Sequence, residues 1–313
     1  MKKLLVIIPA ALLLAAGGIW FFANQQMKNL VDMRIAEFIE NGDYQALDYE
    51  KVSVDLRGDI ALANLHVVDA SGYEYILEDI RITDFDYANE QPQHLSLAAS
   101  GIRFPGGLPR FGDSPNPALN AYLDTVMDAD HLPVTFNYRY SYQPEDDRQL
   151  DTTFSIALPG SFQISSDSVM RNVSPEQFGN QAQAAGNPVG YSMMMQDADI
   201  PSANIALLDL GIVDAVMAIN GGNAGLSADQ YRMQLLAQLQ TMLLFAPQQL
   251  QPLAQRLLAG FAEFLEGGRT LRLSIAPEFG GNIQQLQGEI LGAFYIGNFN
   301  RIEEVLNLTI ETF

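Results

Sequence analysis

The chain has 313 residues, 48% of them hydrophobic, which is enough for a substantial core and excludes a disordered tail. Its 17 basic and 37 acidic residues give a net charge of −20, which argues against nucleic-acid binding and repels anionic lipid headgroups. The absence of cysteine excludes disulfides, thiolate catalysis, cysteine-bound metals and lipid attachment to an N-terminal cysteine.

An uncharged segment, residues 4–23, follows Lys2 and Lys3 at the N-terminus. As a helix it would span roughly 30 Å, the thickness of the hydrocarbon core of a bilayer. We therefore predict a single transmembrane anchor, represented by Leu4, Ile8, Leu13, Ile19, Trp20 and Phe22. The alternative is a signal peptide with a cleavage site in the small residues 15–17. The apolar run continues past that site to an interfacial tryptophan, which favours the anchor.

The charge distribution orients the predicted anchor. Lys2 and Lys3 favour a cytoplasmic N-terminus, and all 37 acidic residues follow residue 28. The sequence therefore predicts that the body lies outside the cytoplasm, in the periplasm.

Beyond the anchor, apolar residues recur at helical spacing from Met27 to Ile39, and Asn41 and Gly42 end the pattern. We expect a short amphipathic stalk helix that packs on the protein's own sheet. Membrane-surface binding is the alternative, which its acidic side chains disfavour.

From Tyr49 the apolar period changes from 3.6 to 2, which predicts strands. A hairpin turns at Gly58 and Asp59, with an irregularity near Asn64, and strand-like segments follow at 75–77, 80–87 and 95–104. The Gly- and Pro-rich segment 106–117 predicts a loop, followed by a short helix at 118–128. Alternation over 134–142 and 150–158, joined by a turn at 143–148, predicts the clearest hairpin. The next turn leads into a further strand at Phe162.

The C-terminal block has a different pattern. Residues 200–210 predict a strand and 211–219 a short helix, which the Asn- and Gly-containing segment 220–223 should end. Ser227 is a helix cap, and apolar stripes over 227–266 predict two helices in an antiparallel hairpin. Alternation at Leu271, Leu273 and Ile275, and again at Leu306, Leu308 and Ile310, predicts closing strands.

The sequence thus predicts an α+β fold in which an antiparallel, curved β-meander follows an N-terminal transmembrane helix and carries a C-terminal αα-hairpin. The expected blocks are a membrane anchor at 1–28, stalk and N-terminal meander at 29–112, helix and central hairpin at 113–190, and a C-terminal block at 191–313.

Catalytic and metal-binding motifs are absent from the sequence. His66, His94 and His131 are far apart in the chain, and no nucleophile elbow, phosphate-binding loop or dinucleotide fingerprint occurs. We therefore expect a protein without catalytic residues, cofactor or metal. A carboxylate-dependent hydrolase is the lesser alternative, because acidic pairs such as 128/130, 146/147, 197/199 and 303/304 could meet in the fold.

The order of membrane helix, stalk and the strand–turn–strand of residues 51–69, followed by Glu-Asp-Ile-Arg-Ile at 78–82, resembles the start of AsmA-like bacterial envelope proteins. The later segments 138–150 and 207–211 resemble membrane-anchored proteobacterial proteins of the same general style. This resemblance implies an inner-membrane, periplasm-facing, β-rich protein with envelope or lipid-related work. AsmA-like proteins are generally much longer than this chain.

The predicted meander presents one long apolar face that must be covered. If the helices leave a groove open, acyl chains are its natural occupants in a tethered protein. We therefore expect the body to bind a lipid or another apolar envelope molecule. The alternative is a scaffold that binds an envelope protein partner. The expected groove residues are Val54, Ile82, Leu97, Phe136, Tyr138, Phe154 and Ile156.

Overall fold

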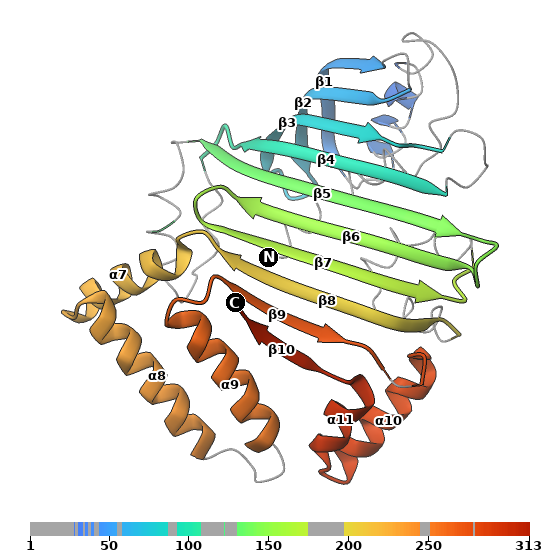
Figure 1. Ribbon diagram of the computed structural model, residues 1–313. Coiled ribbons are helices and arrows are strands. Elements are labelled where there is room, and N and C mark those ends of the chain that lie inside the picture. Colours follow the sequence, from blue (N-terminus) through green and yellow to red (C-terminus); the bar gives the residue numbers. More distant parts are fainter. Residues whose placement is uncertain are drawn as a thin grey trace. The chain divides into compact units, whose positions relative to one another are not determined.

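The computed structural model describes residues 28, 31–33, 35–36, 39–40, 44–54, 58–86, 93–107, 122, 130–174, 197–244, 251–277 and 279–313. Ten strands form one antiparallel sheet in the order of the sequence, from β1 to β10 (Figure 1). The chain forms two compact units, the first containing β1 to β5 and most of β6, the second β7 to β10 and helices α7 to α11. The predicted α+β class with an antiparallel meander is confirmed.

The six strands that begin the sheet are long and paired with their neighbours in sequence. They are β1 (Tyr44–Val54), β2 (Ile60–Asp69), β3 (Glu74–Thr83), β4 (His94–Arg103), β5 (His131–Gln143) and β6 (Gln149–Leu158). The central hairpin of β5 and β6 lies where the sequence predicted it. β1 begins five residues before the predicted start at Tyr49.

The core of the first unit lies on one face of β1 to β5. Buried and half-buried side chains alternate along these strands, so one face carries almost all of the fully buried residues. Each such side chain contributes about 1.5–3 kcal/mol relative to exposure. Members exposed by 2% or less are Ile60, Leu62, Leu65, Val67, Ile80, Ile82, Leu95 and Leu97.

A row of irregular residues crosses this unit. The buried alternation changes phase at Asn64, which has a φ of +50°, and at Gly101, which has a φ of +69°. A Cβ at Gly101 would lie 2.2 Å from Oε2 of Glu78, so this side chain crosses the strand only because position 101 is glycine. The predicted irregularity at Asn64 is present, and its neighbours in β3 and β4 change phase with it.

Described residues of the predicted stalk are helical. Val31 and Ile35 are buried, and the hydroxyl of Tyr49 in β1 donates a hydrogen bond of 2.7 Å to Asp32. These two members of the stripe therefore pack on the protein, as expected, whereas Ile39 is 38% exposed. The predicted anchor at 4–23 lies outside the described residues. Among the helices that the structure describes, none is both long and apolar enough to cross a membrane.

The second unit contains β7 (Phe162–Arg171), β8 (Asp199–Asp209), β9 (Thr270–Ile275) and β10 (Thr309–Thr312). Its helices are α7 (Ile212–Ala224), α8 (Ala228–Leu244), α9 (Gln251–Leu265), α10 (Ile283–Tyr295) and α11 (Phe299–Leu306). The predicted pair at 227–266 is present as α8 and α9. The predicted cap is confirmed too, because Ser227 Oγ accepts from the Gln230 N–H at 3.2 Å while the Gln230 side chain accepts from the Ser227 N–H.

Two predictions in this unit are wrong. The segment 220–223 does not break the chain: α7 continues to Ala224, because Gly221 is buried under the turn that follows, where a Cβ would lie 2.9 Å from the Ser227 carbonyl oxygen. The C-terminal alternation is also interrupted, since Leu306 ends α11 and β10 begins only at Thr309. The sequence analysis did not predict α10 or α11.

Helix α9 packs directly on β9 and β10 (Figure 1). At Gly260 a Cβ would lie 2.7 Å from Cγ2 of Ile310, and Thr312 Oγ1 donates to the Gly260 carbonyl oxygen at 2.9 Å. The missing side chain lets the helix axis approach the strands. Gly260 is therefore a packing residue rather than a flexible one.

We expect Gly260→Val to lower the free energy of unfolding by about 1–3 kcal/mol, because the added methyl groups force α9 away from Ile310. Urea unfolding followed by circular dichroism measures this. Gly288→Val on α10 is the control, since a Cβ there meets nothing within 4 Å. Equal effects of both substitutions would contradict the proposed role of close packing.

Tyr75 gives the first unit a sensitivity to alkaline pH. Its pKa is raised above the ordinary value of 10.0, chiefly by burial and then by Tyr44 and Asp69. The folded protein therefore holds this proton more tightly than the unfolded chain. The associated stability is present below pH 10 and is lost as pH rises above it.

We expect Tyr75→Phe to leave stability at pH 8 nearly unchanged, because the buried hydroxyl has no hydrogen-bond partner among the described residues. The same variant should lose less stability than the parent between pH 10 and higher pH. Urea midpoints across that range test this, and parallel curves for both proteins would contradict it.

Candidate functional site

The structure places four of the predicted groove residues in one row across the first unit. Val54 pairs with Ile60, Ile60 with Ile82, Ile82 with Leu97, and Leu97 with Tyr138. Side chains at paired positions share a face. The five residues therefore form a continuous apolar line from β1 to β5.

The other three predicted residues lie on β5 and β6. The rings of Phe136 and Phe154 meet edge to face, with centroids 5.4 Å apart. Phe136 is buried, whereas Phe154 and Ile156 are half-buried.

Burial divides the seven predicted residues into two groups. Ile82 and Leu97 are 1% exposed and Phe136 is 7% exposed, so packed side chains already cover them. Val54, Tyr138, Phe154 and Ile156 are half-buried. A ligand could reach only this second group without displacing the core.

A second apolar surface lies on β7, β8 and β9. The register places Ile164 opposite Leu207 and Leu207 opposite Leu271, while Ile205 lies opposite Leu273. We call these five residues the apolar strip. The sequence reading noted most of them as strand residues but did not group them, because the pairing partners are far apart in the chain.

Helix α9 covers only one side of the apolar strip. Leu271 lies 3.7 Å from the Cβ position of Gly260 in α9, so β9 is in contact with the helix. Ile205 on β8 is nevertheless 48% exposed, and Ile164 and Leu207 are half-buried. Side chains of this type contribute most when fully buried, so the exposed part of the strip can gain from an apolar partner.

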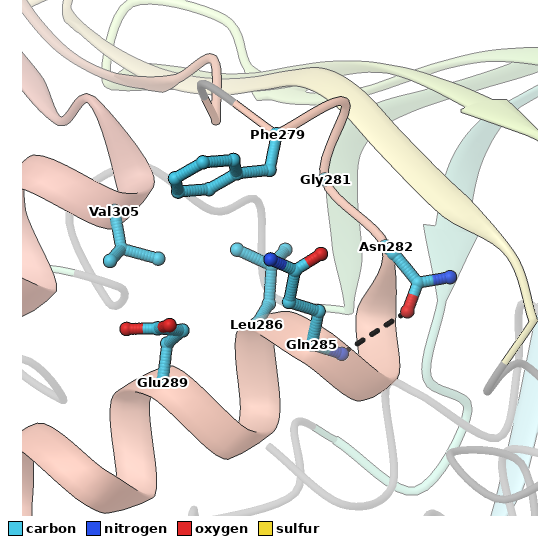
Figure 2. Close-up of a pocket in the computed structure, with 7 residues that line it drawn as sticks. All are labelled: Phe279, Gly281, Asn282, Gln285, Leu286, Glu289 and Val305. Carbon is cyan, nitrogen blue, oxygen red and sulfur yellow. Dashed lines mark hydrogen bonds between the residues drawn. The ribbon is translucent and has the colours of Figure 1, made fainter.

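A small pocket lies between α10, α11 and the segment that follows β9. Figure 2 shows the ring of Phe279 above it, Leu286 and Glu289 on α10 below, and Val305 on α11 opposite. These side chains leave no space between them even for a water molecule, whereas typical small-molecule sites measure about 300–1,000 Å³. The pocket's only lining carboxylate, Glu289, pairs with Arg301 at 3.3 Å. It is therefore a shallow depression that is too small to hold a ligand.

Hydrogen bonds to Asp199 hold the start of α10 against the strands. This carboxylate accepts from Nδ2 of Asn172 at 2.6 Å and from Nδ2 of Asn282 at 3.2 Å. Asn282 in turn caps α10 by accepting from the Gln285 N–H at 3.1 Å (Figure 2). A Cβ at Gly281 would lie 2.0 Å from the Ile200 carbonyl oxygen, so the chain approaches β8 closely.

We expect Asp199→Ala to destabilise the protein by about 1–3 kcal/mol, because two part-buried amides lose their acceptor. Asp197→Ala is the matched control, since Asp197 is exposed and two residues away. Thermal unfolding of both variants measures the difference. A loss no larger than that of the control would show that the carboxylate is dispensable.

The described acidic pairs do not line the pocket between α10 and α11. Glu303 pairs with Arg256 and Glu304 pairs with Arg301, and the Asp146–Asp147 pair lies in the exposed turn between β5 and β6. Asp128 lies outside the described residues.

The histidines are dispersed on the first unit. His66 lies 2.7 Å from Glu74, His131 lies 3.2 Å from Glu78, and His94 lies 3.9 Å from Asp84. Within the described part of the chain, no group of three His, Cys, Asp or Glu residues could hold a metal ion.

Fold and surface together define an α+β protein in which a ten-stranded antiparallel sheet carries a partly open apolar strip. A family model described as "Uncharacterized protein" matches residues 155–312, about half of the chain, and the chain belongs to this family. The match begins near the end of β6 and runs into β10, so it includes all five residues of the strip. No curated protein matches the sequence.

Proposed function

We propose that this protein is a non-catalytic, membrane-anchored envelope protein whose periplasmic body binds a lipid or another apolar molecule. One observation carries the proposal. The apolar strip remains partly open beside α9, with Ile205 48% exposed. An acyl chain would bury this surface without displacing any packed side chain.

The two apolar surfaces favour different roles. The row from Val54 to Tyr138 has a packed centre, which is typical of a structural core. The apolar strip has no fully buried member, which is typical of a surface that receives a partner. We therefore assign ligand binding to the strip.

Charge limits how such a ligand would arrive. The net charge of −20 opposes flat adsorption of the body on anionic headgroups. The predicted anchor at 4–23 supplies membrane proximity instead, at the inner membrane of a bacterium. The resemblance of residues 51–69 and 78–82 to AsmA-like proteins supports lipid-related work.

We expect Ile205→Asn to reduce the labelling of β8 by a phospholipid with a photoactivatable acyl chain, by roughly three- to tenfold. The full-length protein is reconstituted in vesicles, irradiated and digested, and labelled peptides are quantified by mass spectrometry. This mapping separates the strip from residues 4–23, where an anchor would also be labelled.

Leu208→Asn is the matched control. Leu208 is a half-buried residue of the same strand, three positions from Ile205, and its side chain lies on the opposite face of β8. Equal labelling of both variants, or labelling confined to residues 4–23, would overturn the lipid proposal. Capture of a stoichiometric envelope protein without lipid would then favour the scaffold alternative.

A further inference from the structure

Four apolar side chains at the end of α10 are strongly exposed. Leu291, Phe294, Tyr295 and Ile296 are 56%, 62%, 85% and 76% exposed. The ring of Phe294 meets that of Phe299 in α11 edge to face, with centroids 5.8 Å apart. This contact fixes the turn between the two helices. We call the four exposed residues the apolar tip.

The apolar tip lies at the end of the helix pair that is remote from the strands. At the other end, the Ile283 N–H donates to the Ala198 carbonyl oxygen at 2.9 Å, and the Ala276 N–H donates to the Leu306 carbonyl oxygen at 3.0 Å. These bonds join the start of α10 and the end of α11 to the strand region. Because α10 has 13 residues, the tip lies about 20 Å along the helix axis from that attachment.

The tip is uncharged although the protein is strongly acidic. Residues 290–300 contain no charged side chain, in a chain with a net charge of −20. The flanking charges, Glu289 and Arg301, pair with each other at 3.3 Å. The end of the helix pair therefore presents apolar and aromatic groups with little electrostatic opposition of its own.

We propose that the apolar tip inserts into the interfacial region of a lipid bilayer and docks the second unit on the membrane. Aromatic side chains such as Phe294 and Tyr295 are enriched at this depth, where the ring is apolar and the hydroxyl stays hydrated. The strands that hold α10 lie about 20 Å from the tip along the helix, which exceeds the Debye length of about 8 Å at physiological ionic strength. The acidic side chains of those strands are therefore largely screened from the headgroups when the tip is inserted.

The size of the tip favours a bilayer over a protein partner. A standard protein interface buries about 800 Å² on each side. Even at roughly 150–250 Å² for each side chain, four side chains that are between 56% and 85% exposed supply less, about 400–700 Å². A bilayer accepts a narrow insertion of this kind, and a chain with a segment long enough to span it would be held close to that surface. The inference rests on the membrane tether of the proposed function, and not on lipid binding by the strip.

The absence of cysteine makes the test direct, because an introduced cysteine is the only labelling site. We expect full-length Tyr295→Cys, labelled with an environment-sensitive fluorophore, to shift to shorter wavelength in phosphatidylethanolamine–phosphatidylglycerol vesicles. Acyl-chain quenchers should quench it, and iodide should not. Met233→Cys on α8 is the control, because that side chain is 64% exposed and should be quenched by iodide alone.

A combined Leu291→Ser and Ile296→Ser variant of the labelled protein should weaken insertion roughly tenfold. Quenching of the Tyr295 label by iodide alone would overturn the proposal. A shift that grows with protein concentration in detergent without vesicles would overturn it in favour of a second copy of this chain. If the tip inserts while β8 is not labelled by lipid, the lipid-binding proposal fails and the docking proposal stands. If β8 is labelled while the tip does not insert, the docking proposal fails and the lipid-binding proposal stands.

Discussion

The first unit depends on keeping the apolar side chains of five successive strands on one face. A slip of one residue in any strand would turn its whole apolar set toward solvent. The line from Val54 through Ile60, Ile82 and Leu97 to Tyr138 shows that the register is kept across all five. With about 1.5–3 kcal/mol for each buried member, the correct register is strongly favoured over its neighbours.

A row of polar side chains at the irregular positions explains how the register is kept although the buried alternation of the strands changes phase. The Glu50 carboxylate accepts a hydrogen bond from the Asn64 side chain. The Asn64 side chain in turn accepts one from Arg103 at 2.8 Å, and Arg103 lies 2.8 Å from Glu78. His131 lies 3.2 Å from the same carboxylate. These five polar side chains come from five neighbouring strands and lie where β2, β3 and β4 change phase. The polar row therefore keeps the irregularities aligned, so that both halves of each strand bury their apolar residues.

Local patterns predicted the elements that are set by short-range chemistry. Alternation placed the hairpin of β5 and β6, and Ser227 placed the start of α8. The same patterns failed where tertiary contact decides. Gly221 and Gly222 are usual helix breakers, yet α7 continues because the following turn packs on Gly221. α10 begins through Asp199 and Asn282, which are 83 residues apart, and no local signal reports such a contact.

The candidate site could be predicted only in part for the same reason. Alternation in the sequence predicts that a strand has an apolar face. Whether that face is covered depends on where α9 lies, and this is determined by Gly260 in α9 and Thr312 in β10. The sequence therefore identified Ile82, Leu97 and Phe136 as apolar without showing that they are core. The apolar strip required the register between β7, β8 and β9. Its partial exposure and the exposed end of α10 both belong to the second unit, the part that the family model matches. Packing within the second unit leaves apolar side chains exposed at both the apolar strip and the apolar tip. The unit therefore has more apolar surface than its own fold buries.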